Sequence, residues 1–305
     1  MANLPVVLLV GVTGMLGYEI AHAILNKGTM ELRALVRADG TNDENKKRKL
    51  DALKAKGATF VEGDIMNSAS LPGAVAGVEA VISAIGNDPD SYIVGQTNLL
   101  EAAEQASVKR FIPSDFTGNY HKLDYGDNFN TDMRKQFFEV LKQSNVPYVS
   151  INNGAFMEVM LAPFIGTFNL EAGIFNYWGE GNELCDFTSY PDVANYTAEV
   201  VADESLANVI LEFAGEVTTL KQILAVYEEV TGRKLNEQHN GSLDDLKASI
   251  ESAKASTKSP FEYLGRQYLW IMQSGKAKLE HIANERYPHI KPINFRAFFS
   301  KLSNS

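Results

Sequence analysis

The chain has 305 residues, of which 45% are hydrophobic and 22% are charged. This apolar content is enough to form a core, so the composition excludes disorder as the main state. The 38 acidic residues outnumber the 28 basic residues and give a net charge of -10, which argues against non-specific binding to nucleic acid. We therefore expect a folded protein without a nucleic-acid partner.

The start of the chain and its few cysteine and histidine residues bear on the cellular setting. No basic stretch precedes the first apolar run at Val6, and no window approaches the roughly 18 apolar residues that a membrane span needs. The single cysteine, Cys185, cannot form an intrachain disulfide, and the histidines lack metal-ligand spacing. We therefore expect a cytoplasmic protein with no membrane partner and no bound metal.

Six short apolar runs alternate with stretches of helical periodicity in the first half of the chain. This alternation predicts βαβ units and a parallel sheet with helices on both faces. Right-handed crossovers then give a doubly wound Rossmann sheet, so the fold class is α/β. The predicted strands are 6–12, 32–37, 59–64, 80–85, 110–114 and 148–152, and the predicted helices are 15–26, 43–56, 92–106 and 132–144.

The second half of the chain loses this alternation. Helices are predicted at 189–203, 219–231 and 242–255, with a strand at 208–214 and a helical, aromatic tail. We predict a Rossmann domain over residues 1–153 and a smaller C-terminal α+β domain over residues 154–305. The 208–214 strand is a candidate to return to the Rossmann sheet.

Three glycines form a GxxGxxG pattern between the first predicted strand and the first predicted helix. Such glycines permit a tight turn and let the backbone approach a pyrophosphate, while the helix N-terminus offers N–H groups. A tight βα turn without a ligand is the alternative, but the strand–turn–helix context favours a dinucleotide. The loop residues predicted to bind it are Gly11, Thr13, Gly14, Met15, Leu16 and Gly17.

The end of the second predicted strand distinguishes NAD from NADP. An NAD site carries an acidic residue about 20 residues after the glycine loop, where it binds the ribose 2′-hydroxyl. That place is held here by Arg37, followed by Thr41 and by the basic run 46–48. A guanidinium suits a 2′-phosphate, so we predict that Arg37 and Lys46 bind NADP(H). At least two residues of 46–48 are expected to be a solvated helix face.

The ends of the other predicted strands are expected to line the same crevice, because ligands of such sheets bind outside the carboxyl ends of the strands. For Asp64, capping a turn and contacting the adenine are equally good interpretations. The strand-end residues predicted to contact the cofactor are Asp64, Ile65, Ala84, Ile85, Gly86, Ser114 and Asn153.

Several stretches together resemble one known family, the NmrA-like, isoflavone-reductase-like branch of the atypical short-chain dehydrogenases. The resemblance runs in order along nearly the whole chain, and "RFIPSDF" at 110–116 is its most specific part. It implies NADPH binding by a Rossmann domain and a small C-terminal substrate domain. The other matching stretches are 11–17, 63–64, 81–86, 147–148, 154–157 and 179–182, together with Arg37.

The resemblance also implies where catalysis takes place. We expect no YxxxK pair in the chain, as in the atypical branch, and instead a lysine 13 residues before the proline of a Pro-Tyr pair. Counting back from Pro147 gives Arg134, with Lys135 as the alternative register. Apolar residues three and seven positions later, Phe137 and Leu141, favour Arg134.

An arginine at this position changes the chemistry, because its guanidinium effectively does not lose a proton. Arg134 could orient the nicotinamide ribose or polarise a carbonyl group. Proton delivery would then belong to Tyr120, Tyr125, His121 or water, although each of these residues alone is better explained as a surface loop residue.

Two functions follow from these observations. The first is an NADPH-dependent reductase of a small aromatic or conjugated carbonyl or enone compound, and the second is a non-catalytic NADP(H)-sensing regulator that acts through a protein partner. Apolar residues after the sixth predicted strand favour a substrate pocket, with core packing as an equal alternative. The residues predicted to contact substrate are Phe116, Gly154, Phe156, Met157 and Met160.

Overall fold

A computed structural model describes residues 4–38 and 43–303, so Thr41 lies outside the described residues. The chain forms two compact units, each built from three segments. Unit 1 contains the chain up to Asp115 together with Met133–Ile151 and Val193–Leu211. Unit 2 contains Phe116–Asp132, Asn152–Asp192 and the chain from Glu212 on.

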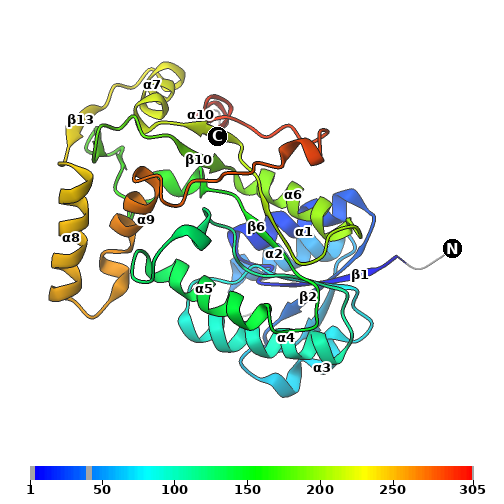
Figure 1. The fold of residues 1–305 in the computed structure, drawn as a ribbon. Coiled ribbons are helices and arrows are strands. Elements are labelled where there is room, and N and C mark those ends of the chain that lie inside the picture. The colour runs from blue at the N-terminus through cyan, green and yellow to red at the C-terminus, as the bar shows by residue number, and fades with distance from the viewer. Residues whose placement is uncertain (1–3, 39–42, 304–305) are drawn as a thin grey trace. The chain divides into compact units, whose positions relative to one another are not determined.

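Unit 1 contains a five-stranded parallel sheet in the order β3-β2-β1-β4-β5 (Figure 1). The central strand β1 is an apolar run because it is covered on both faces, and Val7, Leu8 and Leu9 are fully buried. The strand order reverses between β1 and β4, which is where an α/β sheet opens a crevice. The strands are β1 Val6–Val10, β2 Glu31–Val36, β3 Thr59–Glu62, β4 Ala80–Ser83 and β5 Arg110–Ile112.

Helices connect these strands as the alternating pattern predicts, but the short helix α3 between β3 and β4 was not among the predicted helices. The helix predicted at 92–106 differs in one respect, because it begins with a π-helical turn, η3, at Ser91–Gly95 before α4. The helices are α1 Met15–Lys27, α2 Glu44–Ala55, α3 Pro72–Val75, α4 Gln96–Gln105 and α5 Phe129–Leu141.

The sixth predicted strand is present as β6, Val149–Asn152, but its ladder is not with the main sheet. It pairs with β11, Val209–Glu212, and a single parallel bridge from Phe111 to Tyr148 connects this region to β5. Helix α6, Tyr190–Ala202, reaches the rest of unit 1 through an ion pair of Lys27 Nζ with Glu199 at 2.6 Å. The predicted α/β Rossmann class is confirmed.

Among its described residues, unit 2 holds two small sheets and several helices. Its core is aromatic, since the ring of Phe168 contacts the rings of Phe175, Tyr227 and Phe299. One sheet has the order β12-β10-β7 and the other β13-β9-β8. The elements are β7 Ala155–Phe156, β8 Phe168–Asn169, β9 Ile174–Tyr177, β10 Cys185–Thr188, β12 Glu216–Thr218, β13 Asn236–His239, α7 Leu220–Thr231, α8 Leu243–Ser256, α9 Leu264–Gln273 and α10 Phe295–Ser303.

Candidate functional site

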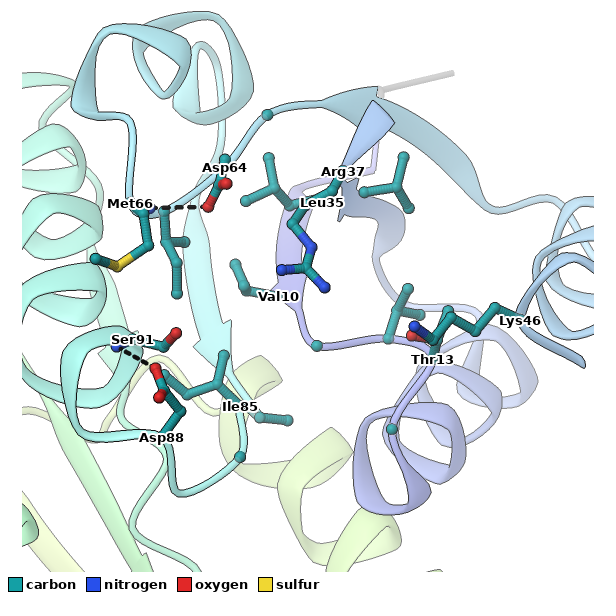
Figure 2. Close-up of a pocket in the computed structure, with 18 of the residues that line it drawn as sticks. Val10, Thr13, Leu35, Arg37, Lys46, Asp64, Met66, Ile85, Asp88 and Ser91 are labelled. Carbon is teal, nitrogen blue, oxygen red and sulfur yellow. Dashed lines mark hydrogen bonds between the residues drawn. The ribbon is translucent and has the colours of Figure 1, made fainter. Parts of the chain in front are cut away.

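Unit 1 contains a cavity of about 310 Å³ at the carboxyl ends of β1, β2 and β4 (Figure 2). It lies in the crevice that the strand order creates beside β1. Ten of its lining residues are among those predicted to bind the cofactor: Gly11, Thr13, Gly14, Arg37, Lys46, Asp64, Ile65, Ala84, Ile85 and Gly86. The others are Val10, Val12, Leu35, Val36, Leu50, Gly63, Met66, Asp88 and Ser91.

The glycine loop has a geometry that side chains would prevent. Gly11 has a φ of +89°, and a Cβ there would lie 2.2 Å from the carbonyl oxygen of Ala84. A Cβ at Gly17 would lie 2.2 Å from the carbonyl oxygen of Gly11. Gly14 is the N-cap of α1. Because glycine has no side chain, the N-cap residue provides no side-chain acceptor for the N–H groups in the first turn of α1. This backbone fits a pyrophosphate, which needs close approach and N–H donors.

Basic side chains surround one end of the cavity. Figure 2 shows the Arg37 guanidinium extending into the cavity, between the Asp64 turn on one side and Thr13 with Lys46 on the other. Lys47 and Arg48 are exposed on α2 and do not line the cavity, as expected for a solvated helix face. The structure thus concentrates positive charge at the end of β2, although the chain as a whole is acidic.

Lys49 is a basic residue near this cavity that sequence reasoning missed. Its Nζ donates a hydrogen bond of 2.9 Å to the carbonyl oxygen of Thr13, and it lies 5.0 Å from the centroid of the Tyr18 ring. The signal was its spacing from Lys46, because residues three apart share one face of a helix. Lys49 thereby tethers the glycine loop to α2.

Two carboxylates at the rim are engaged by backbone N–H groups. Asp64 accepts the Met66 N–H at 2.9 Å, and Asp88 accepts the Ser91 N–H at 2.9 Å, as the dashed lines in Figure 2 show. The Ser91 N–H lowers the pKa of the Asp88 carboxyl, because it favours the ionised form. Asp64 therefore makes the turn-capping contact, and it also lines the cavity.

Some predicted cofactor residues do not line the cavity. Met15 is exposed at the start of α1, and Leu16 and Gly17 follow it in the first turn. Ser114 is buried, and its Oγ donates to the carbonyl oxygen of Ile85 at 2.9 Å. Asn153 belongs to unit 2. A cofactor contact for each of these residues stays a prediction.

Arg134 is buried in unit 1, with 6% of its surface exposed. Its Nε donates to the main-chain carbonyl oxygen of Asp115 at 2.6 Å. Nη1 and Nη2 each lie 3.3 Å from Asn87 Oδ1, and the guanidinium carbon lies 5.2 Å from the centroid of the Tyr92 ring. Arg134 therefore connects α5 to the loops that follow β4 and β5.

A buried polar cluster surrounds this arginine. Asp115 accepts a hydrogen bond from Ser150 Oγ and lies 3.5 Å from the Tyr92 hydroxyl, which also donates to the Ser114 carbonyl oxygen at 2.9 Å. Burial holds the pKa of the Tyr92 hydroxyl above its ordinary range, so this phenol stays protonated at neutral pH. The cluster fixes the main chain at Asp115, to which Arg134 is bonded.

Lys135, the alternative to Arg134, is half-buried on α5. Phe137 and Leu141 are fully buried, and they share a helix face with Arg134, which is the face that the register argument requires. A catalytic role for either basic residue stays a prediction.

The residues predicted to contact substrate all lie in unit 2. Met157, Met160 and Phe116 are buried, which favours the packing interpretation of these three side chains. The ring of Phe156 is half-buried against Tyr190, with 4.3 Å between centroids. Gly154 has a φ of +68°, and a Cβ there would lie 2.2 Å from the Asp186 carbonyl oxygen. Their contact with a substrate stays a prediction.

The proton-delivery candidates are also in unit 2. Tyr120 is fully buried beside the ring of His121, whereas Tyr125 is exposed. Contrary to expectation, the spacing Tyr-x-x-x-Lys does occur in the sequence, at Tyr287 and Lys291. It lies in an irregular segment between the 3-10 turn η7, Asn284–Arg286, and α10, so the two side chains are not on successive turns of a helix. Sequence spacing alone could not reveal this.

Across residues 4–38 and 43–303, no group of three or more His, Cys, Asp or Glu side chains is placed to hold a metal ion. Among the helices of the same ranges, none has the length and apolar character needed to cross a membrane.

Comparison with known proteins identifies the class and then the family. The fold is that of solved Rossmann-type reductases: the structure of AtPrR2 with NADP+ and (+)pinoresinol has a TM-score of 0.85 and 23% identity, covering 99% of both chains. Leucoanthocyanidin reductase with NADPH from Vitis vinifera also has a TM-score of 0.85, with 21% identity over 98% of this chain and 100% of that one. A model of the NmrA-like family matches residues 5–283, so the chain belongs to the NmrA-like family.

Sequence relatives have names of the same kind. "Probable pinoresinol-lariciresinol reductase 3" of Arabidopsis thaliana is 28% identical over 238 residues, which are 76% of this chain and 75% of the relative. "Phenylcoumaran benzylic ether reductase PT1" of Pinus taeda is 27% identical over 250 residues, 76% of this chain and 77% of the relative. The predicted resemblance to isoflavone-reductase-like proteins is confirmed.

Proposed function

We propose that the chain is an NADPH-dependent reductase of a small aromatic or conjugated compound. The observation that carries this proposal is the place of Arg37, whose guanidinium enters the cavity at the end of β2, with Lys46 lining the same cavity. An NAD-specific site would carry an acidic residue at that strand end. A guanidinium and an ammonium group instead complement the charge of a 2′-phosphate.

The cavity also fits the rest of such a cofactor. Glycine at positions 11 and 17 lets the backbone of this turn pack where a Cβ would collide with the carbonyl oxygens of Ala84 and Gly11, and the N-terminus of α1 favours negative charge. We assign the pyrophosphate to this loop, the 2′-phosphate to Arg37 and Lys46, and the adenine to the rim at Asp64 and Ile65. When bound, NADPH supplies a hydride, and the protein contributes binding, orientation and exclusion of water.

The substrate class rests on the relatives. Their names describe reductases of pinoresinol, lariciresinol and phenylcoumaran benzylic ethers, and one solved structure similar in fold to this chain holds (+)pinoresinol with NADP+. These are aromatic compounds, in agreement with the aromatic or conjugated substrate expected from the sequence. Carbonyl and enone compounds of this kind are the first class to test, and aromatic benzylic ethers are the second.

The test is NADPH oxidation by the purified protein with single compounds from both classes, with NADPH binding measured on the same sample. We expect consumption of NADPH that requires one compound and that NADH supports at least about tenfold less well, because the 2′-phosphate contacts would be lost. No binding of NADPH would contradict the whole proposal. A preference for NADH would contradict the role given to Arg37.

A second function is favoured by one observation, the state of Arg134. Arg134, which the family resemblance places at the position of a lysine, cannot give up a proton and is already bonded to Asp115 and Asn87. This agrees with a regulator that binds NADP(H) without turnover and responds through a protein partner. Such a protein would bind NADPH and NADP+ with different affinities or couple binding to its partner, and it would consume no NADPH with any compound.

A further inference from the structure

We propose that Arg134 is a positioning residue that holds the loop after β4 in the form that binds the dinucleotide, through the side chain of Asn87. This inference rests on the proposed function, because it concerns the same cavity. It assigns to Arg134 neither proton transfer nor direct contact with a substrate.

The first argument is the number and direction of the contacts that Arg134 makes. Its Nε is bonded to the Asp115 carbonyl oxygen at 2.6 Å, while Nη1 and Nη2 both face Asn87 Oδ1 at 3.3 Å. A planar guanidinium with fixed donor directions can join two loops in this way, whereas the single ammonium of lysine cannot reproduce both directions. The Tyr92 ring, 5.2 Å away, packs against the guanidinium.

The second argument is the place of Asn87 in the chain. Its neighbours Gly86 and Asp88 both line the cavity, so the position of Asn87 sets the course of this rim. Gly86 is exposed and has no atom within 4 Å of the place where a Cβ would stand, so local packing does not hold it. Asp88 caps the turn at Ser91, which begins η3. The bond to Arg134 therefore ties the rim to a buried helix face.

The third argument is that Arg134 has a rigid base. Asp115 is buried and is held by Ser150 and Tyr92, and Phe137 and Leu141 on the same face of α5 are fully buried. A side chain that is anchored in this way stays in place and can hold the Asn87 side chain in a fixed position. We infer that loss of either side chain of the Arg134–Asn87 contact loosens the same part of the cavity rim and lowers the affinity for the same dinucleotide.

The experiment measures the Kd for NADPH by fluorescence titration of the full-length protein. The variants are Asn87→Ala, Arg134→Gln, Arg134→Lys and the double variant Asn87→Ala with Arg134→Gln. Asn87→Ala and Arg134→Gln are each expected to raise the Kd about tenfold, since each removes a charge-assisted hydrogen bond. The double variant is expected to match the weaker single variant, because both changes remove one interaction. Arg134→Lys is expected to restore affinity in part.

Two controls separate positioning from a general loss of stability. Gln136→Ala is an exposed change on α5 and is expected to leave the Kd and the melting temperature unchanged. Leu224→Ala opens the buried face of α7 in unit 2 and is expected to lower the melting temperature while the Kd, measured well below melting, stays within about twofold of wild type. Asn87→Ala changes a half-buried loop residue, so it provides a test even where Arg134→Gln does not fold.

The outcomes are distinct. If wild type does not bind NADPH, the proposed function fails before this inference is tested. If wild type binds NADPH and both Asn87→Ala and Arg134→Gln bind it equally well, the positioning role is wrong. Additive losses in the double variant also overturn it, because they would show two independent contributions. Loss of turnover at unchanged Kd in Arg134→Gln alone would return Arg134 to a catalytic role.

Discussion

Arg37 shows how a single basic side chain can define a local environment that differs from the average of the chain. It enters the cavity of a protein with a net charge of -10, and Lys46 lines the same cavity. Attraction between such charges and a phosphate is strong at short range and is screened by salt beyond about 10 Å. The overall acidity therefore does not oppose the binding of an anionic cofactor here.

Replacing Arg37 tests this interpretation directly. We expect Arg37→Ala to raise the Kd for NADPH about 10- to 100-fold, because a charge-assisted contact to the 2′-phosphate is removed. The Kd for NADH should change less than about threefold, since NADH lacks that phosphate. Titration calorimetry with both nucleotides gives the measurement, and Lys47→Ala, an exposed change on α2 outside the cavity, is the control. An equal loss for both nucleotides would remove Arg37 from the 2′-phosphate site.

Sequence reasoning found part of the cavity at the residue scale and missed another part. Arg37 and the glycines could be predicted because their function depends on a fixed distance along the chain after β1. Asp88 and Ser91 could not, because they lie in a polar loop whose course depends on a π-helical turn. The bonds of Arg134 to Asp115 and Asn87 join residues 19 and 47 positions apart, and no sequence period encodes such separations.

At the scale of elements, the turn between β1 and α1 depends on the absence of side chains. A Cβ added at Gly11 or Gly17 would collide with a backbone oxygen, which cannot move aside as a flexible side chain could. The first turn of α1 is consequently packed against the end of β1. This geometry brings the N-terminus of the helix to the cavity.

The Gly17→Ala variant tests this turn. A methyl group 2.2 Å from the Gly11 oxygen has to displace the backbone, so we expect the free energy of unfolding to fall by about 1–3 kcal/mol and NADPH binding to be lost. Gly73→Ala is the matched control, because nothing lies within 4 Å of its Cβ position in α3. Denaturant unfolding and nucleotide titration give the two quantities. Normal binding by Gly17→Ala would contradict the packing described.

The elements of unit 1 were predictable and most strands of unit 2 were not. The strands of the main sheet are continuous apolar runs because both faces are covered. In contrast, β13 consists of Asn236–His239, all exposed, and β8 has only two residues. Apolar and polar residues do not alternate along such strands, and they are defined only by their pairing with β9. The pairing of β6 with β11 joins segments far apart in the sequence, and the sequence indicated the 208–214 strand as a candidate to return to the Rossmann sheet without naming its partner.

At the scale of the whole molecule, one thiol reports on the integrity of unit 2. Cys185 in β10 is 3% exposed, and burial, assisted by Asp186 and Glu183, raises the pKa of its thiol to about 12. We expect thiol reagents at pH 8 to label the native protein at least about 100-fold more slowly than the denatured protein, because only the thiolate reacts. Absorbance with a chromogenic disulfide measures this, and rapid labelling of the native protein would contradict the burial.

The raised pKa of the Cys185 thiol predicts that the free energy of unfolding falls as pH rises. The native pKa lies above the ordinary value of 9.0, so the unfolded thiol ionises first and the contribution of Cys185 to stability is lost as pH rises from 9 toward 12. Between pH 9 and 11 the slope is up to about 1.4 kcal/mol per pH unit. Cys185→Ala is expected to unfold in urea with a flatter dependence on pH in this range. Parallel profiles for both proteins would contradict the assignment.

The division of the chain into alternating segments has a consequence for synthesis on the ribosome. Unit 1 contains Val193–Leu211, and this segment includes Glu199, which pairs with Lys27, and Val201, whose carbonyl oxygen is bonded to Arg110. The main sheet therefore emerges long before the segment that completes it, and two segments of unit 2 emerge in between. Closing such loops carries an entropic cost, and non-local contacts slow folding. Because the nascent chain exposes an unfinished apolar sheet until residue 211 is available, we expect its yield in cells to depend on the rate of translation and on chaperones.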